Sequence, residues 1–429
     1  MKKMPLDQLP YLITITFLTV ILAGCSKTTP VPQPPNSNAT AMILSISVDS
    51  GYYTTKVIIK GSGFSSTISD DVVAFNGIAA VVTSASSTQI ITSVPLAAGT
   101  GPVSVTVAGA TATGPSFLYK PTEVVTTFAG NFNPGTADGQ GTAASFSQPF
   151  GITIDHSGNF YVSDQEGNRI RKITPGGLVS TFAGSGSQGF ADGAATAATF
   201  SLPAGLTTDA SGNVFVADMG NGLIREISPA GQVTTFAGNR LPHSIDGQGT
   251  AASFNGPVGI TSDASGNLYV VEESGGVARE ITPSALVSTI ASGLNNPTGV
   301  AVDPTGNLYE VDQFYSLIQK ITPAGVITRV AGSSQGFTNG TGSGAQFNLP
   351  TGIAIDKNGN LYVADTQNHM VRKITPAGVV TTLAGNGNQG MDNGPAMSAT
   401  FIYPLGVAVD NLGNVFVVDG DAIREITYQ

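Results

Sequence analysis

The chain has 429 residues, and its 54 Gly, few charges (11%) and absence of Trp are typical of a turn-rich β protein with room for two or three domains. Its formal net charge is −10 and it shows no basic stripe, which argues against nucleic-acid binding, because that depends on Lys and Arg neutralising phosphates. With 1 Cys, it excludes an internal disulfide.

Residues 1–25 have the pattern of an export signal: two early lysines, then an apolar stretch, 11–23, that is short for a membrane span. The stretch ends in Leu22-Ala-Gly-Cys25, which resembles a bacterial lipobox. The resemblance implies cleavage before Cys25, a lipid on its thiol, and a lipid-anchored protein of the cell envelope. Ser26 after the Cys, in place of an Asp, resembles an outer-membrane sorting signal. The alternative is an ordinary signal or membrane helix in which Cys25 is incidental.

Residues 26–40 are Pro-rich and predict a stiff, extended tether. Residues 41–120 contain short alternating strands with frequent turns, which predicts a small β-sandwich. The runs Ile43 to Gly51, Val57 to Phe64 and Val73 to Gly77 resemble IPT/TIG immunoglobulin-like domains. In exported bacterial proteins this resemblance implies a spacer, or else a part in carbohydrate recognition.

Residues 121–429 contain one unit repeated six times. The copy at 349–385 reads as four short strands, with Gly-containing turns between the first two and between the last two. A regular period with four antiparallel strands per unit predicts β-propeller blades. A Pro-x-Gly signature marks each copy, at Gly151, Gly205, Gly259, Gly299, Gly352 and Gly406.

The last copy stops after its third strand, whereas an isolated fourth strand, residues 124–130, precedes the first copy. This offset predicts a ring that the N-terminal strand closes. The motifs Pro-x-Gly-Ile-x-x-Asp, Gly-Asn-x-Tyr-Val-x-Asp and Asn-x-x-x-Arg-Lys-Ile resemble NHL repeats, which build six-bladed propellers. We therefore expect an all-β chain, with a small immunoglobulin-like β-sandwich followed by a six-bladed β-propeller.

Two further features recur. An acid closes the second strand of every copy, and an Arg lies on the third strand of five copies, which predicts ion pairs that hold the scaffold. Five copies also follow an Asp-Gly or Asn-Gly loop that leads to a Phe. One carboxylate per loop is too few for Ca²⁺, so we interpret these loops as Asx turns with a Phe packed between blades.

The fourth copy departs from the pattern. Its entry link, 293–297, is short and has no Asp-Gly loop, which predicts a notch in the rim. Its next turn places two adjacent aromatic residues where other copies carry small polar ones, so they either form a ligand platform or fill the gap left by the missing loop. The candidate ligand-binding residues, which include two from the loop before the third copy, are Phe314, Tyr315, Gln313, Asn295, Arg240 and His243.

No nucleophile–base spacing or metal-ligand cluster emerges, so the sequence predicts no catalytic residue, metal or cofactor and leans away from an enzyme. The leading hypothesis is a non-catalytic binding module for an extracellular polysaccharide, by analogy with glycan-capturing lipoproteins of similar architecture. The expected partners are the membrane, through the anchor, and a glycan or an envelope protein. The alternatives are a protein-interaction scaffold in the envelope and a propeller hydrolase or lyase with a channel metal.

Overall fold

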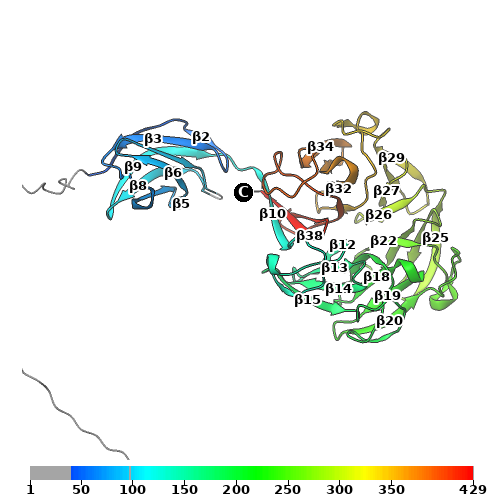
Figure 1. The fold of residues 1–429 in the computed structure, drawn as a ribbon. Coiled ribbons are helices and arrows are strands. Elements are labelled where there is room, and N and C mark those ends of the chain that lie inside the picture. The colour runs from blue at the N-terminus through cyan, green and yellow to red at the C-terminus, as the bar shows by residue number, and fades with distance from the viewer. Residues whose placement is uncertain (1–39, 96–97, 429) are drawn as a thin grey trace, which may run out of the picture.

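The computed structural model describes residues 40–95 and 98–428. The predicted lipid-attachment residue Cys25 and residues 26–39 of the predicted tether lie outside these described residues. Two sheets form an N-terminal sandwich, and six sheets form a ring (Figure 1). Within the described ranges, no helix has the length and hydropathy needed to cross a bilayer. The short 3-10 helices are η1 (Ile68–Asp70), η2 (Gly141–Ala143), η3 (Met219–Asn221), η4 (Gly249–Ala251), η5 (Gly342–Gly344) and η6 (Thr366–Asn368).

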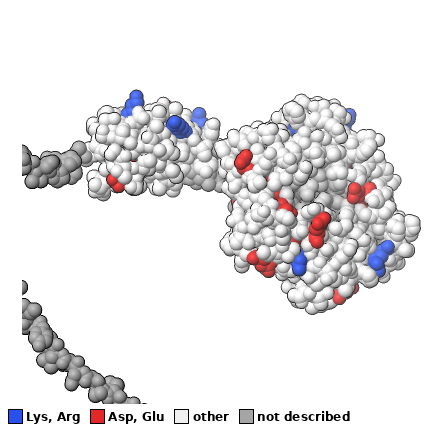
Figure 2. All heavy atoms as spheres, viewed as in Figure 1, with Lys and Arg blue, Asp and Glu red and all other residues white. Residues whose placement is uncertain are grey.

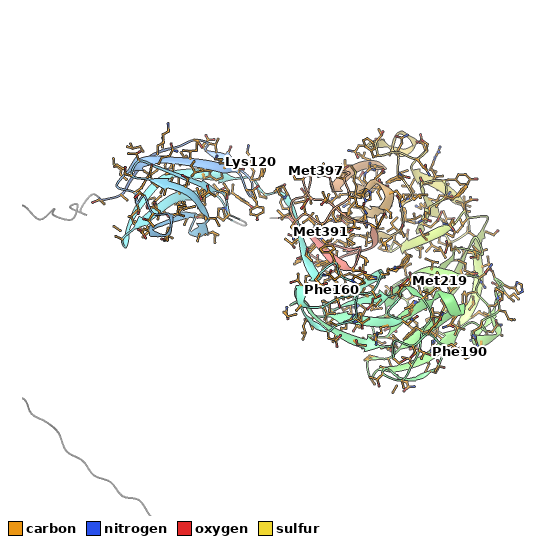
Figure 3. The ribbon with its side chains drawn as sticks, in the orientation of Figure 1. Lys120, Phe160, Phe190, Met219, Met391 and Met397 are labelled. Atoms are coloured by element: carbon orange, nitrogen blue, oxygen red, sulfur yellow. The ribbon has the colours of Figure 1, made fainter. Side chains whose placement is uncertain are left out.

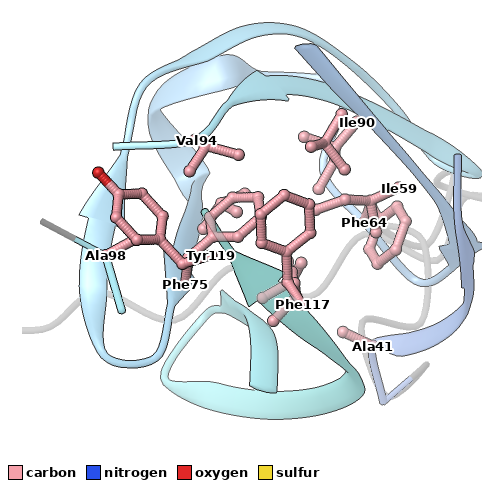
Figure 4. Close-up of a cluster of buried hydrophobic side chains, with 13 residues drawn as sticks. Ala41, Ile59, Phe64, Phe75, Ile90, Val94, Ala98, Phe117 and Tyr119 are labelled. Atoms are coloured by element: carbon pink, nitrogen blue, oxygen red, sulfur yellow. The ribbon is translucent and has the colours of Figure 1, made fainter. Parts of the chain in front are cut away.

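The sandwich packs a sheet ordered β1-β3-β7-β6 against one ordered β2-β9-β8-β4-β5. Along β3, Val57 and Ile59 are buried while the residues flanking them are more exposed, which is the alternation expected of a sheet with one covered face. Phe75 and Phe117 meet edge to face in the core, with centroids 5.2 Å apart (Figure 4). The strands are β1 (Met42–Ile46), β2 (Ser50–Gly51), β3 (Lys56–Ser62), β4 (Asp71–Phe75), β5 (Ile78–Ala80), β6 (Val82–Ser86), β7 (Gln89–Ser93), β8 (Gly101–Val107) and β9 (Ala110–Tyr119).

The ring consists of six blades, numbered here in the order of their innermost strands. In blades 1 to 6 these innermost strands are β12 (Pro149–Ile154), β17 (Pro203–Thr208), β22 (Pro257–Ser262), β26 (Pro297–Val302), β31 (Ile353–Ile355) and β36 (Pro404–Val409). The second strands are β13 (Phe160–Asp164), β18 (Val214–Asp218), β23 (Leu268–Glu272), β27 (Leu308–Asp312), β32 (Leu361–Asp365) and β37 (Val415–Asp419).

The third strands are β14 (Arg169–Ile173), β19 (Leu223–Ile227), β24 (Val277–Ile281), β28 (Leu317–Ile321), β33 (Met370–Ile374) and β38 (Ala422–Tyr428). The fourth strands are β15 (Leu178–Ala183), β20 (Gln232–Ala237), β25 (Leu286–Ser292), β29 (Ile327–Ala331), β34 (Val379–Ala384) and, in blade 6, β10 (Glu123–Gly130).

Blade 6 takes its strands from both ends of the ring. Its order is β35-β10-β38-β37-β36, and β10 pairs antiparallel with β38, with Val124 opposite Thr427. Figure 1 shows cyan β10 beside red β38. The predicted closure by the N-terminal strand is confirmed.

The signature glycines let the innermost strands approach each other backbone to backbone. If each glycine is replaced by alanine without other movement, the added Cβ lies within 2.8 Å of a carbonyl oxygen in the next blade. For Gly406 that oxygen belongs to Phe150, at 2.5 Å, and two further backbone atoms of blade 1 lie at 3.1 and 3.2 Å. A side chain therefore does not fit at these positions, which explains why the signature recurs in every blade.

A buried arginine ties together each of the five blades that follow a long loop. In blade 2, Arg225 donates to Asp218 Oδ2 at 2.9 Å and to Asp192 Oδ1 in the loop at 2.7 Å. Its guanidinium lies 5.2 Å from the centroid of the buried Phe200 ring. The predicted acid–arginine pairs and packed phenylalanines are therefore confirmed, and they join a blade to its own entry loop. The other arginines are Arg171, Arg279, Arg372 and Arg424.

The Asp-Gly and Asn-Gly loops differ from the Asx turns that the sequence suggested. Their Asp or Asn side chain accepts from the arginine, while the next two residues form a short fifth strand on the outer edge of the blade. The interpretation was wrong because the acceptor's partner is a side chain more than thirty residues away, whereas an Asx turn is local. These strands are β11 (Gly139–Gln140), β16 (Gly193–Ala194), β21 (Gly247–Gln248), β30 (Gly340–Thr341) and β35 (Gly394–Pro395).

Candidate functional site

Blade 4 lacks the loop-and-arginine arrangement. It has four strands, and Gln319 replaces the arginine and donates to Asp312 Oδ2 at 3.2 Å. The loop acid and the loop carbonyls that would accept from an arginine are missing together, so a buried guanidinium there would be left with unused donors. The change from Arg to Gln is therefore the one expected where the loop is missing.

The gap left by the missing loop is filled by Leu294, not by the aromatic pair. Leu294 is buried and packs with Tyr269, Val271 and Val300 between blades 3 and 4. Phe314 and Tyr315 are instead 66% and 51% exposed, and their rings meet edge to face with centroids 5.1 Å apart. The interpretation that these two side chains fill the gap is wrong, and the alternative of an exposed platform agrees with their geometry.

Hydrogen bonds hold the turn that carries these aromatics. Asp312 Oδ1 accepts from the backbone N–H of Tyr315 at 2.9 Å. Gln313 Oε1 accepts from Asn296 at 2.8 Å, and Gln313 Nε2 donates to Thr351 at 3.3 Å, so this amide side chain fixes the turn and is half-buried. Asn295 is exposed beside it and hydrogen-bonds Asp312. We call Phe314, Tyr315 and Asn295 the blade 4 platform.

Two solved structures share this architecture. An auxiliary nutrient binding protein from Bacteroides thetaiotaomicron has a TM-score of 0.69 at 19% identity, over 92% of this chain and 99% of that chain. One from Bacteroides ovatus has a TM-score of 0.64 at 20% identity, over 92% and 100%. At these identities the likeness shows the fold.

Family comparisons match one segment in the sandwich and one in the ring. Residues 41–119 match the IPT/TIG domain, and residues 347–374, which enter blade 5, match the NHL repeat. The chain joins an IPT/TIG domain to an NHL-type propeller. Protein SUPPRESSOR OF QUENCHING 1, chloroplastic, of Arabidopsis thaliana is 39% identical over 97 residues, which is 22% of this chain and 9% of that protein. The chain thus spans under a tenth of that curated relative.

In the NHL propeller, the other two predicted residues lie apart from the platform. Arg240 stacks over the ring of Phe190, 3.6 Å from its centroid, and Figure 3 places Phe190 at the outer rim. His243 is exposed in the same loop as Arg240. Among the described residues, no hydrogen bond, ion pair or ring contact joins either residue to Phe314 or Tyr315. On the face drawn in Figure 2, Lys and Arg are few and scattered.

The central channel is narrow and mostly aliphatic. Cavities of 60 and 190 Å³ follow its axis, and both are lined by the inner-strand residues Ile152, Leu206, Ile260, Val300, Ile353 and Val407. The described residues that line these two cavities include no carboxylate and no imidazole. Nor do the described residues contain a group of three or more His, Cys, Asp or Glu placed to hold a metal. The channel therefore offers backbone, aliphatic and Thr groups to a ligand.

Glu310 is a second anomaly of blade 4. It is fully buried on β27, at the position that valine occupies in the other blades, and both carboxyl oxygens lack a hydrogen-bond partner in the described part of the chain. Burial raises the pKa of Glu310 well above its usual value, and the nearby charge of Asp312 adds to this. Its valine counterparts are Val162, Val216, Val270, Val363 and Val417.

We predict that Glu310→Val stabilises the propeller by about 1–3 kcal/mol at pH 7, because it removes an unsatisfied buried carboxyl. The pKa of Glu310 is higher in the folded than in the unfolded state, so the wild type loses stability as pH rises above the unfolded pKa. The gain should therefore grow between pH 4.5 and pH 8 in urea unfolding followed by circular dichroism. The isosteric Glu310→Gln should show the same pH trend. A gain in unfolding free energy that does not change with pH would contradict the prediction.

Proposed function

We propose that this chain is a lipid-anchored protein of the cell envelope whose NHL propeller binds an extracellular polysaccharide without catalysis. The observation that carries the proposal is the blade 4 platform: two exposed aromatic rings lie on a turn held by Asp312, and the exposed amide of Asn295 hydrogen-bonds the same Asp312. Exposed aromatic faces with adjacent polar groups suit the alternating C–H and hydroxyl surfaces of a sugar chain. The two Bacteroides proteins of the same architecture are auxiliary nutrient binding proteins, which supports a binding role.

The anchor in this proposal is Cys25, and the tether is residues 26–40. The outer-membrane location in this proposal is supported by Ser26 after the lipobox, which resembles an outer-membrane sorting signal. Labelling cells with tritiated palmitate tests this part, because Cys25→Ser should abolish incorporation into the protein.

The platform is tested by affinity gel electrophoresis of residues 26–429 against a panel of polysaccharides. Phe314→Ala combined with Tyr315→Ala should weaken retardation at least about tenfold, because anchors of this kind typically contribute 1 kcal/mol or more each. The matched control is Phe337→Ala combined with Met391→Ala, which removes two other exposed apolar side chains from loops of blades 5 and 6.

The control should bind as the wild type does. If the platform variant and the wild type are retarded equally, the platform is not the binding site, but polysaccharide binding still stands. Absence of retardation across the panel would favour the alternative, a scaffold for envelope proteins. The other alternative, a hydrolase or lyase with a channel metal, stays third, because the described channel lining includes no carboxylate or imidazole.

A further inference from the structure

A cavity of 770 Å³ opens between blades 2 and 3, at the end of the propeller opposite the platform. It is lined by the turns that follow β17 and β22, by the outer part of blade 2, and by Thr153, Ile154 and His156 of blade 1. Hydroxyl, amide and carboxylate groups line it beside phenylalanine rings. The residues that the argument uses are Asp209, Phe215, Glu226 and Phe236.

The same turn in four other blades shows what Asp209 lacks. There a tyrosine hydroxyl donates to the second carboxylate oxygen of the turn aspartate, as Tyr269 does to Asp263 at 3.1 Å. The other three distances are 3.4, 3.3 and 3.1 Å. Blade 2 carries Phe215 at this position, so Asp209 Oδ2 accepts from Asn213 at 2.8 Å but receives no tyrosine hydroxyl. An acceptor site beside Phe215 is left for a hydroxyl donor.

A second substitution widens the same space. In blades 1, 4 and 5 a lysine covers the tyrosine ring, as Lys373 does over Tyr362 with its Nζ 5.6 Å from the centroid. Blade 2 carries the shorter Glu226 there, and no hydrogen bond found among the described residues involves its carboxylate. Burial raises the pKa of Glu226, and the nearby charge of Asp209 adds to the effect.

Blade 6 shows that these two changes do not open a cavity by themselves. It carries Phe416 and Glu425 at the same positions. There the rings of Phe160 and Phe128 pack on Phe416, with centroids 4.3 and 5.3 Å away. In blade 3 the position of Phe160 is occupied by the smaller Leu268, so the corresponding space beside Phe215 stays open.

We propose that this cavity binds a short saccharide as a second site. Sugar hydroxyls would donate to Asp209 Oδ2 and to the Glu226 carboxylate, taking the place of the tyrosine hydroxyl of the other blades. The C–H face of a sugar ring would pack on Phe236, which is half-buried and meets Phe215 edge to face at 5.1 Å. The inference rests on the proposed function for its ligand class but uses none of the platform residues.

A hydroxylated ligand fits better than a metal ion. The chain itself satisfies the equivalent aspartates with hydroxyl groups in four blades. Thr207 and Ser262 hydroxyls, 2.9 Å apart, extend the same chemistry along the cavity wall. In addition, the described residues include no cluster of three or more carboxylates, imidazoles or thiols arranged for a metal.

The test converts blade 2 to the pattern of blade 5 with Phe215→Tyr combined with Glu226→Lys. These residue pairs already fold in blades 1, 4 and 5, so the variant should keep the wild-type melting temperature. Its longer side chains should occupy much of the cavity, because the equivalent cavity beside Tyr362 and Lys373 in blade 5 measures 270 Å³. The matched control is Glu425→Lys, the same charge change in blade 6. Binding is measured by saturation-transfer NMR and calorimetry on residues 26–429, with cello-, xylo-, manno- and laminari-hexaose as probes.

We expect at least one hexaose to bind both the platform double-alanine variant and the Glu425→Lys control. Its affinity for the variant with Phe215→Tyr and Glu226→Lys, the filled-cavity variant, should be at least tenfold lower. Hexaose binding that the filled cavity leaves unchanged would overturn this inference alone. If no hexaose or polysaccharide binds the wild type, the proposed function fails as well. If no hexaose binds, but 5 mM CaCl₂ raises the melting temperature of the wild type and not of the filled-cavity variant, the ligand of this cavity is a cation and not a saccharide.

Discussion

Arg225→Met is expected to destabilise the propeller by about 3–5 kcal/mol, the range observed when one partner of a buried ion pair is removed. The guanidinium of Arg225 is fully buried and donates to Asp218, Asp192 and the carbonyl oxygens of Thr199 and Ala191, at 2.7–3.1 Å. Methionine keeps much of the volume but none of these donors. It leaves the carboxylate of Asp218, which is fully buried, without its cation.

The propeller supplies its own control for this experiment. Asn339 and Asn393 accept from the arginines of blades 5 and 6 at the position of Asp192, at 2.8 and 2.9 Å. Asp192→Asn should therefore cost less than about 1 kcal/mol, since Asp192 is roughly half exposed and its ion pair is screened by water. Denaturant midpoints followed by circular dichroism give both values. A loss below 1 kcal/mol for Arg225→Met would show that the network is replaceable.

Gly406→Ala is expected to destabilise the ring by about 3 kcal/mol, at the upper end of the usual cost of overpacking. The new Cβ would lie 2.5 Å from the carbonyl oxygen of Phe150, and all three nearest atoms belong to the backbone of blade 1. Rotation of a side chain cannot relieve such a contact. The innermost strands instead have to move apart, and in a closed ring that strains the neighbouring blades.

Gly344→Ala is the matched control, because nothing lies within 4 Å of the Cβ it adds and its backbone has no positive φ. This change should be neutral or slightly stabilising, since alanine has less backbone freedom than glycine in the unfolded chain. Thermal unfolding of both variants at one scan rate makes the comparison. Similar midpoints for Gly406→Ala and Gly344→Ala would mean that the inner strands shift without cost.

Features that repeat along the chain could be predicted from the sequence. The strand at 124–130 is nearly a copy of the fourth strand of blade 5, and the paired strand β10 (Glu123–Gly130) is where that likeness placed it. In the sandwich, the runs named from the sequence do not include β5 or β6. These two are short strands with largely exposed side chains, so they carry little hydrophobic periodicity.

Features that depend on a missing group were harder to predict. The loop Asp or Asn and its arginine are 33 residues apart in four blades. The sequence held a signal for this contact, because blade 4 lacks both the loop residue and the arginine. The cavity between blades 2 and 3 likewise combines three differences from other blades: Phe215 lacks a hydroxyl, Glu226 is shorter than lysine, and Leu268 of blade 3 is smaller than its counterpart Phe160. Comparing the copies position by position could have exposed both, whereas a search for motifs in one copy could not.

The seam between β10 and β38 also sets an order of folding. Most blades pair strands that are near neighbours in sequence, but blade 6 must bring residues 123 and 428 together, at the greatest loop-closure entropy in the ring. During synthesis, β10 emerges from the ribosome long before β38 and stays unpaired until β38 is made. Amide protection of β10 should therefore appear last in pulse-labelled refolding. A chaperone that binds β10 before β38 pairs with it would therefore affect assembly of the ring without binding the folded propeller.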